Sequence, residues 1–308
     1  MNVQEYAVID MGSNSIRLMI GVKADDAKPW RFTPKDVIMT RLGEGVDKGG
    51  ALSAESMERT LEALATWRSR LLYVPVCVVA TSAVRDASNG NAFLAEVRAR
   101  FGWHCRIITG SEEALLGFYG ATANMDPKAC ILTLDIGSGS TEVAVGTRNN
   151  VHWSHSYDMG AVRLKERWET ELQSFEKAVA HCNETWVPMD VKPTHIVGIG
   201  GTITTAAAMV QKLNVYDPQK INNYSLALKD VIELIPRLSA LSQEERLAIR
   251  GLPPQRRDII IPGLLILWSF MSHYKYMNII VSDCDLMEGV FYRHAFHDAA
   301  WRNGPNTK

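Results

Sequence analysis

Cysteine is scarce in this 308-residue chain, and the sequence contains no long uninterrupted apolar run. The five cysteines are odd in number and scattered, which argues against a disulfide framework and against a zinc site. The longest apolar run, Ile259 to Met271, contains Pro262 and is too short to span a bilayer. Residues 1–10 show no basic and apolar leader pattern. We therefore expect reduced thiols, a cytoplasmic location and no membrane partner.

A strong net charge is also missing. Lysine and arginine number 33 and aspartate and glutamate 34, so the formal net charge is −1. A chain of this kind has no general attraction for nucleic acid, and a polyanion would need a local group of cations. Apolar residues make up 46% of the chain, and its length suffices for two domains with cores of their own.

A glycine and hydroxyl motif is present, and it occurs twice. In the stretch from Leu134 to Gly146, an apolar strand leads into Asp135, a tight turn follows, and a second strand begins at Glu142. The stretch from Ile9 to Ser15 repeats the pattern at one constant offset, and the matching pairs are Asp10 and Asp135, Gly12 and Gly137, Ser13 and Ser138, Ser15 and Ser140, and Gly21 and Gly146. A repeat at this spacing predicts two related lobes, each with a phosphate-binding hairpin.

The chemistry of the motif suits a phosphate and a metal ion. Glycines let backbone N–H groups approach a phosphate closely, and the hydroxyl groups add donors. Asp135 and Glu142 would repel a phosphate unless a divalent cation lay between them, and hard oxygen ligands suit Mg²⁺. One copy of the motif by itself fits an ordinary hairpin equally well, so the functional interpretation depends on the repeat.

Two further positions favour anion binding. The stretch from Ile196 to Thr202 is a strand followed by a glycine turn and a helix, and the N-terminus of a helix binds anions. Arg85 follows the strand from Val74 to Ala80, at the end of a strand where α/β sheets bind ligands. Each position also has a plain alternative, an isolated glycine turn and a surface arginine.

A pair of glutamates begins the helix that follows Thr109. We expect Ser111 to be the N-cap, so that Glu112 and Glu113 lie in the first turn and complement the helix dipole. That structural role accounts for Glu112. Glu113 lies closer to the buried face of the helix, and it is a candidate general base that activates water.

The domain boundary is predicted from the polar stretch of residues 124–128. It divides the chain into an N-terminal domain, residues 1–124, and a C-terminal domain, residues 125–308. A last helix is expected over residues 289–301, and it is a candidate to complete the N-terminal domain.

The chain resembles the exopolyphosphatase and guanosine pentaphosphate phosphatase (Ppx/GppA) family over nearly its whole length. The stretches that carry the resemblance are Asp10–Leu18, Arg41–Gly45, Ala80–Arg85, Gly110–Ala114, Asp135–Glu142, Gly160–Leu164, Gly198–Thr202 and Ser282–Gly289. The resemblance implies an α/β fold of two actin-like domains, of the sugar kinase, actin and heat-shock chaperone ATPase type (ribonuclease H-like), with an interdomain cleft. It also implies a short form, without the C-terminal helical domains of long members.

The resemblance implies a role for each matching residue. The family's catalytic glutamate corresponds to Glu113, and its metal-associated acids correspond to Asp135 and Glu142, with Mg²⁺ as the cofactor. Its phosphate contacts correspond to Ser13, Asn14, Arg85, Gly137, Ser138, Gly139, Ser140 and Thr141. Arginines that contact a nucleotide or polyphosphate correspond to Arg17 and Arg256, and Arg257 is a further candidate.

Three positions depart from the family pattern. Ser138 stands where a glycine is usual, Met287 where an arginine is usual, and Arg257 where a small residue is usual. These departures affect the preference for a substrate more than the reaction.

We therefore expect a hydrolase that releases the terminal phosphate of inorganic polyphosphate by Mg²⁺-assisted attack of water. Cations that could form a track for polyphosphate are Arg41, Arg85, Arg163, Lys165, Arg256 and Arg257. Three alternatives stay open: a guanosine pentaphosphate hydrolase, a kinase or ATPase of the same superfamily, and a regulator that binds a guanosine polyphosphate without turnover. A homodimer is also open.

Overall fold

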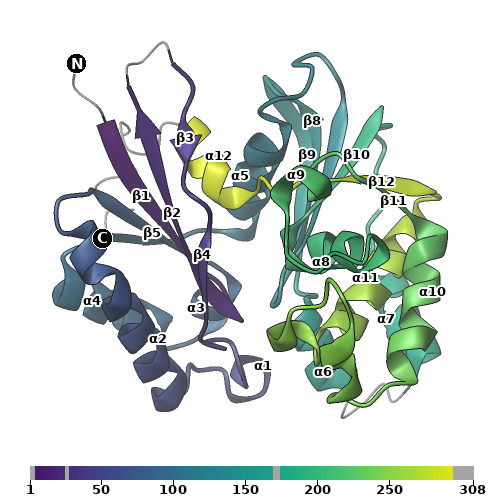
Figure 1. The fold of residues 1–308 in the computed structure, drawn as a ribbon, viewed down its shortest axis with the longest axis horizontal. Coiled ribbons are helices and arrows are strands. Elements are labelled where there is room, and N and C mark those ends of the chain that lie inside the picture. The colour runs from purple at the N-terminus through teal and green to yellow at the C-terminus, as the bar shows by residue number, and fades with distance from the viewer. Residues whose placement is uncertain (1–3, 25–27, 169–173, 294–308) are drawn as a thin grey trace. The chain divides into compact units, whose positions relative to one another are not determined.

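The computed structural model describes residues 4–24, 28–168 and 174–293, and the chain divides into two compact units (Figure 1). The first unit contains the described residues up to Glu113 together with Met287 to Arg293, and the second contains Ala114–Leu286. Each unit is built around a mixed β-sheet with helices packed on it. None of the helices in the described part of the chain has the length and apolarity that a membrane span requires.

The sheet of the first unit has the strand order β3-β2-β1-β5-β6, and β4 also pairs with β2. Its strands are β1 (Gln4–Met11), β2 (Ser15–Lys23), β3 (Arg31–Phe32), β4 (Asp36–Met39), β5 (Val76–Ala80) and β6 (His104–Ile107). Strands β1 and β2 form an antiparallel hairpin, while β1, β5 and β6 are parallel. Five consecutive β-branched and small apolar residues make β5 a fully buried strand.

Helices cover the sheet of the first unit. They are α1 (Val46–Gly49), α2 (Ala54–Trp67), the 3₁₀ turn η1 (Arg68–Leu71), α3 (Ser82–Asp86), α4 (Gly90–Phe101) and α12 (Leu286–Tyr292). Helix α2 begins at Ser53, whose side chain accepts a hydrogen bond from the backbone N–H of Ser56. Trp67 and Phe93 are almost completely buried between these helices and the sheet.

Helix α12 belongs to the first unit although it is distant in sequence. A Cβ atom on Gly21 of β2 would lie 2.4 Å from the ring of Phe291, so the glycine leaves room for this aromatic side chain. Lys35 also forms an ion pair with Glu288 of α12 at 3.2 Å. The part of the predicted last helix beyond residue 293 lies outside the described residues.

The sheet of the second unit has the order β11-β12-β10-β7-β8-β9. Its strands are β7 (Ile131–Ile136), β8 (Thr141–Thr147), β9 (Asn150–Tyr157), β10 (His195–Ile199), β11 (Ser225–Ala227) and β12 (Asn278–Val281). The hairpins β7–β8 and β8–β9 are antiparallel, and β7, β10 and β12 are parallel.

Helices of the second unit enclose a core between the sheet and α8 and α11. They are α5 (Gly110–Thr122), α6 (Ala161–Arg167), α7 (Phe175–Thr185), α8 (Gly200–Val210), α9 (Pro218–Ile221), α10 (Leu228–Ser239), η3 (Glu245–Ala248), η4 (Pro254–Arg256) and α11 (Ile260–His273). The first four residues of α5 fall in the first unit, and the rest fall in the second. Leu134 of β7, Ile203 of α8 and Leu264 of α11 are fully buried in the core.

The two units repeat one topology. In each sheet three antiparallel strands are followed by parallel ones, so β3-β2-β1-β5-β6 corresponds to β9-β8-β7-β10-β12. The first hairpin also has the same turn in both units: Gly12 N–H donates to the Ser15 carbonyl at 3.1 Å, and Gly137 N–H donates to the Ser140 carbonyl at 3.0 Å. The prediction of two α/β units of actin-like type is confirmed. The predicted boundary near residue 124 stays a prediction.

Candidate active site

Two carboxylates face each other in the second unit. Asp135 on β7 and Glu142 on β8 are direct partners in the antiparallel register. Directly opposite residues have their Cβ atoms about 5 Å apart on one face of the sheet. Glu142 is 3% exposed, and its Oε1 accepts a hydrogen bond from the hydroxyl group of Ser156 at 2.7 Å. Asp135 is half-buried, and two carboxylates at this separation repel each other, so the position favours a cation.

The Asp135 carboxylate lies against the start of helix α8. A Cβ atom on Gly200 would lie 2.2 Å from Asp135 Oδ1, and the φ angle of Gly200 is +82°. Glycine therefore meets two requirements at this position, a left-handed backbone and the close approach of a carboxylate. The predicted strand, glycine turn and helix around residues 196–202 are present as β10 and α8, and α8 begins at Gly200, inside the glycine turn.

The next glycine leaves room for an arginine. A Cβ atom on Gly201 would lie 1.7 Å from Nη2 of Arg256 and 2.1 Å from its Cζ. The Arg256 guanidinium group therefore lies over the first turn of α8, the same helix start that Asp135 contacts. Arg257, the neighbouring candidate, is half-buried, and its backbone carbonyl accepts a hydrogen bond from Arg246 at 3.0 Å.

The predicted phosphate loop, Gly137 to Thr141, is fixed by helix α6. The backbone N–H groups of Ala161 and Val162 donate to the carbonyls of Gly137 and Ser138 at 3.0 and 2.8 Å. Arg163 Nε donates to the Gly139 carbonyl at 2.9 Å. The carbonyl oxygens of three successive loop residues thus accept hydrogen bonds from α6. Because these oxygens carry partial negative charge, their hydrogen bonds reduce the repulsion of an anion at the loop. Within the loop, Ser140 and Thr141 are buried, and the Thr141 hydroxyl group donates to the Met159 carbonyl.

In the first unit, the corresponding loop presents an amide donor. Its Ser13 hydroxyl group is 2.9 Å from that of Ser82, and its Asn14 carbonyl accepts from the N–H groups of Thr40 and Arg41. Asn14 is 5% exposed, and among the described residues its buried Nδ2 has no hydrogen-bond partner. A buried donor without a partner costs about 1–3 kcal/mol, which a phosphate oxygen at this position would recover.

Asp10 and Arg17 form an ion pair beside that loop. Arg17 Nε lies 2.8 Å and Nη2 lies 2.6 Å from Asp10 Oδ2, and the two residues are register partners on β1 and β2. Arg17, predicted to contact a nucleotide or polyphosphate, thus already has a carboxylate partner.

Glu113 and Arg85, both predicted site residues, meet in the first unit. Arg85 Nη1 lies 2.9 Å from Glu113 Oε2 and also donates to the Ile108 carbonyl. Burial raises the pKa of Glu113 to about 7 against the opposing effect of Arg85, and the negative charges of Asp10 and Asp86 raise it further. A carboxyl group with a pKa near neutrality can take a proton from water at physiological pH.

The predicted N-cap of α5, Ser111, is wrong. The helix begins at Gly110, and Thr109 caps it: Glu112 N–H donates to Thr109 Oγ1 at 3.2 Å, and Thr109 N–H donates to Glu112 Oε2 at 2.9 Å. This reciprocal capping box is readable from the sequence Thr109-Gly-Ser-Glu112. Arg106 also forms an ion pair with Glu112. Glu112 thus stabilises the start of the helix, in agreement with its predicted structural role.

The described residues contain no group of three or more histidine, cysteine, aspartate or glutamate side chains that could hold a metal ion. Mg²⁺ usually binds through one or two carboxylates together with water and substrate phosphates. The Asp135 and Glu142 pair fits that coordination. Ser156, which holds Glu142, was not found by sequence reasoning because its position opposite Glu142 depends on the register of β9 with β8.

The chain is similar in sequence and structure to known proteins. The model of the Ppx/GppA phosphatase family matches residues 31–297. Exopolyphosphatase 2 of Mycobacterium tuberculosis is 32% identical over 94% of this chain and 98% of its own length. The crystal structure of an exopolyphosphatase from Cytophaga hutchinsonii has a TM-score of 0.84 and 28% identity, and the match covers 94% of this chain and 97% of that one.

A bifunctional 3-dehydroquinate synthase/phosphatase of Fusobacterium nucleatum is 31% identical over 92% of this chain. The chain spans about half the length of that relative, since the match covers 45% of it. The family model covers most of the chain, and the mycobacterial relative is matched over nearly its whole length. This chain belongs to the Ppx/GppA phosphatase family.

Proposed function

We propose that this protein releases the terminal phosphate of inorganic polyphosphate by attack of water, assisted by Mg²⁺. The observation that carries the proposal is Glu113, whose side chain is 13% exposed and lies 2.9 Å from Arg85, with a pKa of about 7. A base that activates the attacking group is needed by an enzyme that transfers a phosphoryl group to water, whereas a binding module does not need one. The relatives named exopolyphosphatase in Mycobacterium tuberculosis and Cytophaga hutchinsonii support the choice of substrate.

In this proposal the first unit supplies the base and an arginine. Glu113 accepts a proton as the water oxygen attacks the terminal phosphorus, and the bridging P–O bond breaks. The shortened polyphosphate leaves with the bridging oxygen. Arg85 holds the Glu113 carboxylate in place and adds a positive charge that stabilises the phosphoryl oxygens. Phosphoryl transfer depends mainly on positioning and charge stabilisation, which these groups provide.

The second unit holds the metal ion and the phosphate chain. Asp135 and Glu142 would bind Mg²⁺, which when bound neutralises charge on the phosphoryl oxygens. Ser156 keeps the Glu142 carboxylate turned in one direction. The loop from Gly137 to Thr141 and the start of α8 provide backbone donors, and Arg256 adds a positive charge above that helix start.

Guanosine pentaphosphate is the weaker substrate in this proposal. Its terminal phosphate is the same chemical group, so the preference depends on contacts to the rest of the molecule. Arg17, a candidate contact for a nucleotide, is held by Asp10 at 2.6 Å, and that pairing reduces what it can offer to a nucleotide.

The test is a substrate panel of long polyphosphate, short polyphosphate, guanosine pentaphosphate and ATP, with phosphate release measured in the presence of Mg²⁺ or EDTA. We expect the highest kcat/KM for a polyphosphate and none of that activity in EDTA. A higher kcat/KM for guanosine pentaphosphate than for every polyphosphate would replace the proposed substrate. Phosphate release that continues unchanged in EDTA would exclude the metal.

A further inference from the structure

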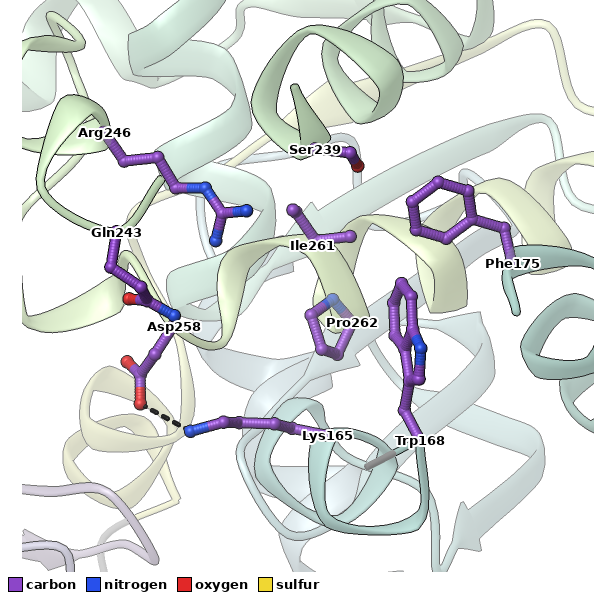
Figure 2. Close-up of a pocket in the computed structure, with 9 residues that line it drawn as sticks. All are labelled: Lys165, Trp168, Phe175, Ser239, Gln243, Arg246, Asp258, Ile261 and Pro262. Atoms are coloured by element: carbon purple, nitrogen blue, oxygen red, sulfur yellow. Dashed lines mark hydrogen bonds and ion pairs between the residues drawn. The ribbon is translucent and has the colours of Figure 1, made fainter. Parts of the chain in front are cut away.

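A cavity of about 290 Å³ lies within the second unit, and none of the residues assigned to the metal or the phosphate loop lines it (Figure 2). Its wall is formed by the end of α6 with the following Trp168, the start of α7, the end of α10, η3 with the residues before it, and the start of α11 with the preceding Asp258. Figure 2 shows two aromatic rings on one side of the cavity and charged side chains on the other. This division suits a ligand that has an apolar ring and a charge.

The aromatic side is preorganised. The rings of Trp168 and Phe175 meet edge to face, with centroids 4.8 Å apart and an angle of 83° between their planes. Ile261 and Pro262, both buried at the start of α11, complete this apolar wall. The two perpendicular rings form an apolar corner in which another aromatic ring can pack without their first having to reorder.

The charged side carries an arginine that backbone groups hold in place. Arg246 donates from Nε to the Leu238 carbonyl at 2.9 Å and from Nη1 to the Arg257 carbonyl at 3.0 Å. In the part of the chain that the structure describes, no carboxylate forms an ion pair with it. Burial lowers the pKa of Arg246, because the charged group is partly removed from water. A fixed and partly desolvated guanidinium group without a counter-charge attracts an anion.

The other two charges in the wall neutralise each other. Lys165 Nζ lies 3.0 Å from Asp258 Oδ2, and their side chains are 27% and 13% exposed. The formal charge of Lys165, Asp258 and Arg246 together is therefore one positive charge. A single negative charge on the ligand would balance the cavity, whereas a polyphosphate carries too many charges and no apolar part.

We propose that this cavity is a binding site for a small planar aromatic carboxylate. The ring lies against Trp168, Phe175 and Pro262, and the carboxylate accepts hydrogen bonds from Arg246. The volume is at the lower end of the range for small-molecule sites, which suits a ligand of one or two rings.

The walls of the cavity connect it to the proposed active site. Lys165 is on α6, whose first residues bind the carbonyls of the phosphate loop. Asp258 follows Arg256, the arginine above the start of α8, by two residues. Arg246, the proposed contact of the carboxylate, donates to the carbonyl of Arg257, which lies between Arg256 and Asp258. A ligand bound to Arg246 therefore acts on this segment, and we infer that it changes the KM for polyphosphate. This second half of the proposal rests on the proposed function, and the first half does not.

The binding site is tested by calorimetry with 2-naphthoate as the probe and the neutral 2-naphthamide as its isostere. We expect saturable binding of 2-naphthoate with one site per chain, and binding of 2-naphthamide at least tenfold weaker, since the amide has no charge for Arg246. Failure of 2-naphthoate to bind with a Kd below about 1 mM, or equal binding of the amide, would overturn the proposal.

Variants of the wall locate the probe. Arg246→Gln should weaken binding of 2-naphthoate about tenfold or more, and Trp168→Leu should weaken both probes. The matched control is Arg250→Gln, which removes an exposed arginine four residues further along the same segment and should leave binding unchanged. Thermal melts establish that each variant is folded, and a folded Arg246→Gln variant that binds like the parent would place the probe elsewhere.

The link to catalysis is tested by the KM for polyphosphate with and without saturating 2-naphthoate. A change in the parent that disappears in Arg246→Gln supports the link. Binding without any change in KM would refute the link and leave the binding site intact. A protein without phosphatase activity would refute the proposed function, and the calorimetric result would still decide whether the cavity binds the probe.

Discussion

The first hairpins of the two units have the same backbone conformation but carry different charged side chains. Both have a glycine that donates to a serine carbonyl three residues on, and both place an aspartate at the end of the first strand. Opposite that aspartate, the first unit has Arg17 and the second has Glu142. The first hairpin therefore neutralises its own acid with an ion pair, while the second brings two acids together and favours a cation.

Under the proposed function, this difference would give the two copies of the fold different roles in one reaction. The shared backbone provides two loops suited to phosphate, and a single position on the second strand decides whether the copy attracts a metal ion. Glu113, the proposed base, belongs to the unit whose hairpin carries the Asp10–Arg17 ion pair, and burial and the negative charges of Asp10 and Asp86 raise its pKa.

The first prediction separates the base from the metal. Glu113→Gln keeps the shape of the side chain and removes the base, so kcat for polyphosphate should fall about a hundredfold or more while the Mg²⁺ affinity stays the same. The matched control is Glu112→Gln, which should lower the melting temperature through the lost capping box and ion pair and reduce kcat less. Reversed effects of the two variants on kcat would move the base to Glu112.

The second prediction concerns the Asp10–Arg17 ion pair in the hairpin of the first unit. Arg17→Gln removes the ion pair of the buried Asp10, and we expect the free energy of unfolding to fall by about 2 kcal/mol. Urea denaturation measures this change. Arg17→Glu makes the first hairpin resemble the second, and its loss of stability should be partly recovered by Mg²⁺, because a new cation site stabilises the folded state. Equal stability of Arg17→Glu with and without Mg²⁺ would show that two facing acids do not suffice for a cation site.

The third prediction concerns the two facing acids. Asp135→Asn and Glu142→Gln should each raise the Mg²⁺ concentration for half-maximal activity about tenfold or more, because each removes an anionic ligand. Glu142→Arg copies the first hairpin and should abolish Mg²⁺ binding measured by calorimetry. Ser156→Ala, which removes only the hydrogen bond to Glu142, should have a smaller effect of the same kind. An unchanged metal requirement in all of these variants would place the metal at other residues.

The fourth prediction is a pH dependence. Glu113 must be deprotonated to accept a proton, and its pKa of about 7 lies above the ordinary value, so kcat/KM should rise with pH through neutrality and differ about tenfold between pH 6 and pH 8. Because the charge of Arg85 lowers the pKa of Glu113, Arg85→Gln should move this rise to higher pH. An acid limb of the pH profile that does not move in Arg85→Gln would separate Glu113 from the observed titration.

The smallest effect is expected at Gly201. A methyl group there would displace the Arg256 guanidinium group. Gly201→Ala should therefore raise the KM for polyphosphate about fivefold, with little change in kcat, since residues in contact are usually coupled by an energy of this size. In a double-mutant cycle, Gly201→Ala should have little further effect in the Arg256→Ala background. Additive effects of the two substitutions would show that Gly201 acts through the helix start itself.

Much of this protein could be predicted from the order of its residues. Alternating and continuous apolar stretches indicated the strands, and the constant offset between the two motifs indicated a repeated unit with two phosphate loops. The positions of Asp135 and Glu142 on either side of a short turn placed them opposite each other, because a tight turn leaves one register for the hairpin. The capping box of Thr109 and Glu112 is also present in the sequence, although the predicted N-cap was Ser111.

Only the tertiary structure decided the features that depend on residues distant in the chain. The pKa of Glu113 depends on burial and on charges from Asp10, Arg85 and Asp86, which lie on other elements of the unit. The position of the Arg256 guanidinium group depends on the absence of a side chain at Gly201. The hydrogen bond that Ser156 donates to Glu142 depends on the register of β9 with β8. Local pattern determines secondary structure and short turns, whereas desolvation and close approach are set by packing between elements, which no stretch of sequence contains.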